Sequence, residues 1–391
     1  MGLKKKDTLV TTVGRDPAKN FGIVNPPVYR ASTVTFPTVA ALEAATKDPF
    51  NHVYYGRHGT PTTFALEEAV ASLEGGHRGI ACASGLAAIT VSLLAYLKAG
   101  DHLLMVDSAY GPTRRVCDAL LSRFGVETTY YDPLIGAGIK DLIRGNTRVV
   151  FTESPGSLTF EVQDVPAIAE AAHARGAVLI LDNSWATPLY FEAFKHGVDI
   201  SIQAATKYLV GHSDAMLGVI VTSEEAFKKV RTAAAVVGAC PGPDECYLAL
   251  RGLRTLAVRL DRHQQAGLEI ARWLKGRKEV ARILHPAFAE CPGHEIWKRD
   301  FTGASGVFGV ILEDYPKRAV AAMLDGMELF AMGYSWGGYE SLILPADLTN
   351  LRTAAKWRAE GPLIRIHAGL EGLDDLIRDL DLGFERLNRN A

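Results

Sequence analysis

The sequence predicts an α/β fold with a mostly parallel central sheet, helices on both of its faces, and a smaller α+β domain at its C-terminal end. Residues 178–181 are all aliphatic, which is typical of a strand buried on both faces of a parallel sheet. Predicted strands and helices alternate through the first part of the chain, and this order favours parallel pairing. A chain of 391 residues is also too long for one compact core.

Composition excludes several classes of protein. Hydrophobic residues make up 48% of the chain and the formal net charge is −2, which indicates a soluble globular protein without an electrostatic reason to bind nucleic acid or a membrane surface. The five cysteines lie apart, without the paired spacing of a zinc site. We therefore expect no metal, and free thiols in a reducing cytoplasm. The N-terminal lysines are not followed by an apolar segment, so we expect no secretory signal.

One uncharged stretch has the length of a membrane helix. Residues 80–97 carry no charged side chain. Ser84 and Gly85 interrupt the stretch near its beginning, and no second apolar segment accompanies it. We interpret it as a strand, a turn and a buried helix, and we predict that the chain does not span a membrane.

Residues 1–60 are predicted to form an arm. Prolines at positions 26, 27 and 37 break regular structure, and only residues 38–46 indicate a helix. An arm of this length cannot bury itself, so we expect it to lie on a neighbouring subunit. A second boundary falls near Arg254. This divides the chain into an arm (1–60), a large domain (61–254) and a C-terminal domain (255–391).

The remaining elements follow from hydrophobic spacing. In the large domain the pattern predicts helices at 62–73 and 166–175, and strands at 79–83, 102–106, 149–153, 178–182 and 198–202. Beyond residue 254, apolar residues hold helical spacing as far as Leu274, broken only at Gln264, and residues 302–312 read as the start of a strand.

A helix that begins at Gly85 is a candidate phosphate site. The backbone N–H groups at a helix start are unpaired and lie at the positive end of the helix dipole. Glycine lets the backbone approach a ligand closely. The alternative is a tight strand-to-helix turn without a ligand.

Lys207 is the residue on which the functional prediction depends. It follows an apolar strand and lies among uncharged neighbours, so its amine is poorly hydrated and easier to deprotonate. Asp182 ends the preceding strand, at the edge where open α/β sheets bind ligands. A lysine on the next strand that can form a Schiff base, and a strand-end carboxylate that keeps a pyridine nitrogen protonated, are what pyridoxal 5′-phosphate (PLP) requires. The alternative is a lysine whose amine reaches the surface.

Three segments carry a resemblance to a known family. Residues 83–88 (ASGLAA), 181–186 (LDNSWA) and 205–214 (ATKYLVGHSD) resemble the PLP enzymes of cysteine and methionine metabolism, the cystathionine synthase and lyase family. The resemblance extends from about residue 11 to the C-terminus. It implies the fold type I of PLP-dependent transferases, which is aspartate aminotransferase-like. It also implies a sulfur amino-acid substrate and a homotetramer, built as a dimer of dimers with shared active sites.

The resemblance also implies roles for individual residues. Gly85, Leu86 and Thr206 would bind the cofactor phosphate. Tyr55 and Arg57 would reach from the arm into the partner subunit's site and bind the same phosphate. The catalytic residues would be Lys207, Asp182 and Tyr110, and Tyr110 would also stack on the cofactor ring and contact substrate.

Two positions depart from the family pattern. Ala204 stands where many members have serine, which removes one hydroxyl from the phosphate site. Ser157 stands where many have an asparagine that contacts the cofactor ring oxygen, so the resemblance does not assign that contact here.

The C-terminal domain is predicted to bind the substrate. Arg365 lies in an alternating, strand-like run, and its guanidinium matches a carboxylate in a bidentate manner; the alternative is a half-buried ion-pair partner. The resemblance makes Arg365 the site of the substrate α-carboxylate, with Ser335 beside it. Relatives that act at the γ-carbon tend to have a smaller apolar residue in place of Trp336. This tryptophan therefore favours β-elimination of cystathionine to homocysteine, pyruvate and ammonia.

Several alternatives stay open at this stage. Within enzymes they are γ-elimination or γ-replacement, and desulfuration of cystine or cysteine. A PLP-fold binding or regulatory protein would lack the lysine or carry a DNA-binding segment, and the sequence shows neither. An NAD-binding protein is disfavoured because no G-x-G-x-x-G follows a strand near the N-terminus. The sequence does not decide whether Lys207 or Tyr110 protonates the leaving sulfur.

Overall fold

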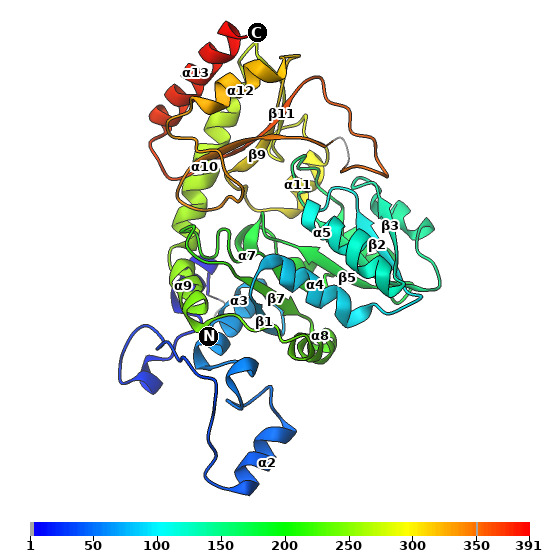
Figure 1. Cartoon of the computed structure of the whole chain (residues 1–391), viewed down its shortest axis with the longest axis vertical. Coiled ribbons are helices and arrows are strands. Elements are labelled where there is room, and N and C mark those ends of the chain that lie inside the picture. The colour runs from blue at the N-terminus through cyan, green and yellow to red at the C-terminus, as the bar shows by residue number, and fades with distance from the viewer. Residues whose placement is uncertain (1–3, 349–350) are drawn as a thin grey trace.

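The computed structural model describes residues 4–348 and 351–391, and it contains a large and a small β-sheet. Figure 1 shows the small sheet near the C-terminal end of the molecule and the large sheet in its middle, with the long helix α10 (Leu256–Lys275) running from one towards the other. The large sheet has seven strands in the order β1-β7-β6-β5-β4-β2-β3. Those strands are β1 (Arg78–Cys82), β2 (His102–Val106), β3 (Glu127–Tyr131), β4 (Thr147–Glu153), β5 (Val178–Asp182), β6 (Ile200–Gln203) and β7 (Gly218–Thr222).

Pairing in the large sheet is mostly parallel, as predicted. The neighbours from β3 through β2, β4 and β5 to β6 all run parallel, whereas β7 is antiparallel to both β6 and β1. The small sheet is antiparallel throughout, in the order β10-β11-β9-β8. Its strands are β8 (Val280–Leu284), β9 (Val307–Leu312), β10 (Leu342–Ala346) and β11 (Leu363–His367).

Helices surround both sheets. The α-helices besides α10 are α1 (Lys6–Thr12), α2 (Val39–Lys47), α3 (Pro61–Glu74), α4 (Gly85–Tyr96), α5 (Gly111–Arg115), α6 (Val165–His173), α7 (Thr187–Tyr190), α8 (Glu224–Val236), α9 (Pro243–Leu253), α11 (His294–Asp300), α12 (Lys317–Asp325) and α13 (Leu373–Arg389). Shorter or irregular helical segments are η1 (Pro17–Asn20), η2 (Gly56–His58), η3 (Val116–Leu121), η4 (Ser122–Phe124), η5 (Gly136–Asp141) and η6 (Ala193–His196).

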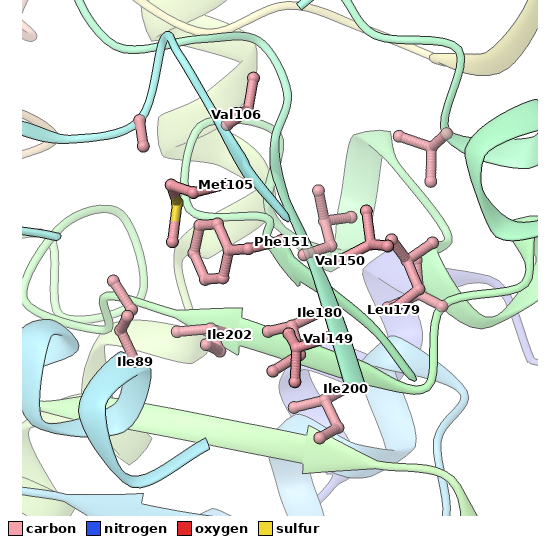
Figure 2. Packing of buried hydrophobic residues seen from close by; sticks show 14 of the residues in the cluster. Ile89, Met105, Val106, Val149, Val150, Phe151, Leu179, Ile180, Ile200 and Ile202 are labelled. Carbon is pink, nitrogen blue, oxygen red and sulfur yellow. The ribbon is translucent and has the colours of Figure 1, made fainter. Parts of the chain in front are cut away.

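The large sheet is buried on both faces, and on β7 alternate side chains enter different hydrophobic clusters. Ile220 of β7 packs in the cluster that contains Ile89 of α4. Its neighbours Val219 and Val221 point the other way, into a cluster with α3 and α9. Figure 2 shows the first of these clusters, in which side chains of β2, β4, β5 and β6 pack together with Ile89. The predicted helices on both faces are thereby confirmed.

The sequence prediction missed one helix. Residues 6–12 form α1, which packs against α3 and α10 and buries Val10 there. The helical spacing beyond residue 254 corresponds to α10, which is continuous through Gln264, where the apolar spacing is interrupted; the Gln264 side chain accepts a hydrogen bond from the Ala304 N–H. Lys207 lies in the turn after β6, which ends at Gln203, one residue beyond the predicted strand 198–202.

The uncharged stretch 80–97 divides into β1 and α4, and no helix among the described residues is long and apolar enough to cross a membrane. The described residues also contain no group of three or more His, Cys, Asp or Glu side chains arranged to hold a metal ion. The five cysteines are unpaired thiols. The domain limits at residues 60 and 254 stay a prediction.

Candidate active site

The parallel strands bring the candidate residues to one edge of the large sheet. β2, β4, β5 and β6 run in the same direction, so their carboxyl ends lie side by side. Tyr110 follows β2, Glu153 ends β4, Asp182 ends β5, and Lys207 follows β6. This is the edge at which open α/β sheets bind ligands.

Lys207 is held in the turn after β6, where its N–H donates to the Ala204 carbonyl oxygen at 2.9 Å. Its amine donates to the hydroxyl oxygen of Ser335 at 2.7 Å and lies 5.4 Å from the centre of the Trp336 ring. Burial, helped by the positive charge of Arg365 and opposed by the Asp182 carboxylate, lowers the pKa of Lys207 to about 8. The predicted poorly hydrated amine is therefore present.

Asp182 is buried at the end of β5. Burial raises its pKa, against the effects of Ser184 and of the Lys207 charge. The Ser184 N–H donates to Asp182 Oδ1 at 3.0 Å, and the Ser184 hydroxyl accepts the N–H of Ala204 at 2.7 Å. Ser184, which the sequence prediction did not single out, thus ties the carboxylate to the turn of Lys207. Among the described residues, no cationic side chain forms an ion pair with Asp182.

Tyr110 is fixed through its backbone by an acid that the sequence prediction left without a role. Its N–H donates to Glu153 Oε2 at 2.8 Å, while its side chain is 47% exposed. Burial raises the pKa of Glu153 well above its ordinary value, and the nearby Asp182 charge raises it further. Glu153 and Asp182 are paired in register on neighbouring strands. A carboxylate at the end of each of two adjacent buried strands is the sequence signal that identifies this pair.

The start of α4 packs against the turn that contains Lys207. A Cβ atom on Gly85 would lie 2.7 Å from the Ala204 Cβ, so this close approach requires glycine. Ser84 caps the helix through the Ala87 N–H, which leaves first-turn donors at Gly85 and Leu86 without an intrahelical partner. The Thr206 hydroxyl accepts the Leu217 N–H at 2.9 Å. Gly85, Leu86 and Thr206, three of the residues predicted to bind phosphate, therefore lie on adjoining segments.

Arg365 enters the site from β11 of the small sheet. Its guanidinium donates to the Ser335 carbonyl oxygen at 2.7 Å, and burial lowers its pKa to about 10. Among the described residues no carboxylate pairs with it, in contrast to the buried pairs Arg231–Glu67 and Arg352–Glu161. The alternative role as an ion-pair partner thus has no support here, and a half-buried guanidinium without an anion is suited to bind one.

His367, two residues further along β11, is a supporting residue that sequence reasoning missed. Its Nε2 accepts the Gly337 N–H at 3.0 Å. Gly337 has a φ of 86°, and a Cβ there would lie 2.9 Å from the Tyr208 backbone nitrogen. The segment with Ser335 and Trp336 is thereby held against the turn of Lys207.

Tyr55 and Arg57 lie on the arm, outside this group of residues. Arg57 donates to the Ala235 carbonyl oxygen at 2.5 Å and Tyr55 is exposed. Figure 1 shows the part of the arm that carries α2 extending away from both sheets. Their predicted contact with the phosphate requires a second subunit and stays a prediction. Ser157 is fixed by its N–H, which donates to the Ser108 carbonyl oxygen at 2.8 Å.

The residues present fit PLP. Within the described part of the chain, the site offers a half-buried amine of lowered pKa, a buried carboxylate without an ion-pair partner, and a glycine-dependent helix start beside them. These match the aldehyde, the pyridine nitrogen and the phosphate of the cofactor.

Comparison with known proteins agrees with this geometry. The family model described as Cys/Met metabolism PLP-dependent enzyme matches residues 7–385. The chain is 52% identical, over 97% of its length and 95% of the relative, to a Rhizobium johnstonii protein whose name proposes cystathionine β-lyase activity. It is 46% identical to the cystathionine β-lyase MetC of Escherichia coli, over 99% of this chain and 100% of the relative.

The fold comparison gives the same result. A crystal structure of metB from Corynebacterium glutamicum matches with a TM-score of 0.89 at 31% identity, covering 98% of each chain. The chain belongs to the Cys/Met metabolism PLP-dependent enzyme family. The predicted family, fold type and cofactor are confirmed, and enzymes of this family act on sulfur amino acids.

Proposed function

We propose that this chain is a cystathionine β-lyase, a carbon–sulfur lyase that converts L-cystathionine to L-homocysteine, pyruvate and ammonia. The observation that carries the proposal is the group formed by Lys207, Asp182 and Arg365: a half-buried amine of lowered pKa beside a buried carboxylate and a guanidinium that has no acidic partner among the described residues. Near full-length relatives that carry this name support the choice of reaction.

Each side chain has a proposed part in holding the cofactor. Lys207 would bind it covalently, Asp182 would face its ring nitrogen, and Tyr110 would stack on its ring. Gly85, Leu86 and Thr206 would bind the phosphate together with the partner subunit's Tyr55 and Arg57. When bound, PLP supplies an electron-accepting ring that stabilises negative charge at the substrate Cα.

The protein's own groups then carry the proton transfers. Arg365 binds the substrate α-carboxylate through its fork of donors. The Lys207 amine, with a pKa of about 8, is suited to remove the Cα proton near neutral pH, and Ser335 orients it by accepting a hydrogen bond at 2.7 Å. The Cβ–S bond breaks with its electron pair on sulfur, which gains a proton from Lys207 or Tyr110 and leaves as homocysteine. Water then hydrolyses the three-carbon remainder to pyruvate and ammonia.

Trp336 favours reaction at Cβ. Its ring packs 5.4 Å from the Tyr208 ring and 5.4 Å from the Lys207 amine, so it fills space directly beside the proposed base. A smaller side chain there would leave room for the rearrangements that reaction at the γ-carbon needs.

The arm supports a proposed homotetramer, arranged as a dimer of dimers with shared active sites. Its apolar side chains are exposed in the single chain: Phe21 is 100% exposed, and Ile23, Val24, Val39 and Leu42 are exposed too. Exposed apolar side chains along an extended arm favour a surface that another subunit covers. Because the five cysteines are unpaired, we also propose that the enzyme works in the cytoplasm.

Product analysis tests the proposed reaction. The purified protein, incubated separately with L-cystathionine and L-cystine, should release pyruvate from cystathionine together with an equal amount of homocysteine. Release of 2-oxobutyrate and cysteine would instead indicate elimination at the γ-carbon, and turnover confined to cystine would indicate a desulfhydrase. Bound PLP without any product would favour the binding-protein alternative. The Lys207→Ala variant serves as the control for non-enzymatic breakdown.

A further inference from the structure

Residues 351–355, which precede β11, lie against the loop that carries Tyr110. Asp107 immediately follows β2, and its residue is 1% exposed. Its carboxylate oxygens accept the N–H groups of three successive residues of that connection: Thr353 at 3.0 Å, Ala354 at 2.9 Å and Ala355 at 3.0 Å. The Thr353 hydroxyl also donates to Asp107 Oδ1 at 3.0 Å. One buried carboxylate therefore accepts hydrogen bonds from three successive residues that lie nearly 250 positions further along the chain.

Arg114 completes this contact from the other side of the Tyr110 loop. Its guanidinium donates to Asp107 Oδ1 at 2.8 Å and to the Thr353 hydroxyl oxygen at 3.1 Å, and it lies 3.7 Å from the centre of the Tyr130 ring. The Arg114 and Asp107 side chains are 6% and 0% exposed. Breaking a buried ion pair of this kind leaves an uncompensated charge, so the arrangement tolerates little displacement.

Electrostatics favours the ionised form of Asp107. Burial alone would raise its pKa, but the N–H groups of Ala355 and Thr353, the Arg114 guanidinium and the Ala354 N–H outweigh burial. They hold the pKa of Asp107 below its ordinary value. Hydrogen bonds to an ionised acceptor are stronger than those between neutral groups.

Two neighbouring residues of the same segment act on the surroundings of Tyr110. Arg352 pairs with Glu161 at 2.8 Å, and its positive charge acts on Glu153, the acid that accepts the Tyr110 N–H. Leu351 lies over Gly111, the residue after Tyr110: its Cδ2 would be 3.9 Å from a Cβ there. Residues 351–355 thus contact the chain both before Tyr110, at Asp107, and after it, at Gly111.

We propose that residues 351–355 act as a positioning segment, which fixes the Tyr110 ring and hydroxyl for the reaction through Asp107 and Arg352. The segment leads into β11, which carries Arg365. It therefore couples the residue that would stack on the cofactor to the residue that would bind the substrate carboxylate. This inference rests on the role proposed for Tyr110 above.

Thr353→Val is the gentlest variant that tests the positioning segment. The residue is exposed, and the substitution removes only the hydroxyl while the backbone N–H keeps its bond to Asp107. In the holoenzyme we expect kcat to fall about 3- to 10-fold with KM changed less than about twofold. We also expect an altered circular dichroism band of the bound cofactor. Asp107→Asn, which removes the charge, should give a larger change of the same kind.

A double-mutant cycle with Tyr110→Phe separates positioning from general stabilisation. If the segment acts through Tyr110, Thr353→Val should lower kcat less than about twofold in a variant that already lacks the Tyr110 hydroxyl. Thr147→Val is the matched control: it removes a hydroxyl that accepts the Arg144 N–H at 2.8 Å, at the amino end of β4 and therefore at the opposite edge of the sheet. Its effect should be a lower melting temperature with kcat unchanged, in both backgrounds.

The proposal is overturned if Thr353→Val leaves kcat and the dichroism band unchanged. It is also overturned if Thr353→Val lowers kcat by the same factor in the Tyr110→Phe background as in the wild-type enzyme. The cycle can be measured with whichever sulfur amino acid the wild-type enzyme turns over, and the dichroism needs no substrate. A wild-type enzyme that fails to release pyruvate from cystathionine would therefore refute the proposed function without deciding the role of residues 351–355.

Discussion

The amine of Lys207 and the hydroxyl oxygen of Ser335 lie 2.7 Å apart, although 128 positions separate them in the chain. Lys207 follows a strand of the large sheet, and Ser335 precedes β10 of the small one. The Ser335 carbonyl oxygen also accepts a hydrogen bond from Arg365. One serine therefore contacts both the proposed base and the proposed carboxylate-binding residue, so the site depends on the arrangement of the two sheets.

Removing the Ser335 hydroxyl should slow the proton transfers more than it weakens substrate binding. We expect Ser335→Ala to lower kcat about 10-fold, because Lys207 loses the group that orients its amine, with KM changed less than about threefold. Steady-state kinetics with cystathionine measure both constants. Ser335 has a φ of 86°, so Ser335→Gly tests whether the backbone conformation contributes. An unchanged kcat in both variants would remove Ser335 from the mechanism.

Capture of PLP by the apoenzyme should depend on pH through Lys207. Only the neutral amine attacks the cofactor aldehyde, and the pKa of Lys207 is lowered to about 8, mainly by burial. The neutral fraction, and with it the rate of capture, should rise about tenfold between about pH 7 and pH 9 and then level off. Stopped-flow mixing that follows the visible absorbance gives this rate. A rate that keeps rising steeply towards the ordinary lysine value of 10.5 would contradict the lowered pKa.

Arg365 should act mainly on substrate affinity. We expect Arg365→Ala to raise KM for cystathionine about 10- to 100-fold with a smaller effect on kcat, because the substrate carboxylate loses its bidentate partner. Arg365→Lys, which keeps the charge but not the fork of donors, should have a KM between those of the wild-type enzyme and Arg365→Ala. A lowered kcat at unchanged KM in Arg365→Ala would speak against a carboxylate-binding role.

Asp182→Asn should affect chemistry far more than folding. The amide keeps an oxygen that can accept the Ser184 N–H, but it removes the negative charge that would face the cofactor ring nitrogen. We expect kcat to fall at least about 100-fold, with the cofactor still bound. Asp199→Asn is the control, since that carboxylate also accepts a backbone N–H, from Leu179, at the opposite edge of the sheet. Equal losses in the two variants would rule out a specific electronic role for Asp182.

Much of the fold could be predicted because its signals are local. The aliphatic run of β5 and the change from strand to helix at Gly85 depend on neighbouring residues, and both predictions are confirmed. Helix α1 was missed because its sequence, KDTLVTT, has little helical preference and its stability comes from packing on α3 and α10. The place of Lys207 after a strand could also be predicted, because the apolar run ends at Ile202 and β6 ends at Gln203.

The residues of the site could likewise be predicted only in part. Lys207, Asp182 and Arg365 could be singled out because a lysine among apolar residues, a strand-end acid and an arginine in an alternating run are local patterns. The supporting contacts could not be predicted, since those of Glu153 with the Tyr110 N–H and of Asp107 with Thr353 join distant parts of the chain. Such contacts follow from the three-dimensional arrangement of backbone donors, which has no periodic trace in the sequence.

The attachment of PLP to Lys207 can be measured directly. The holoenzyme would be treated with borohydride, which reduces the bond between amine and cofactor, then digested and mapped by mass spectrometry. We expect the mass of reduced cofactor on the peptide that contains Lys207, and neither the adduct nor turnover in Lys207→Ala. An adduct on a different lysine, or a Lys207→Ala variant that still releases pyruvate from cystathionine, would contradict the proposed active site.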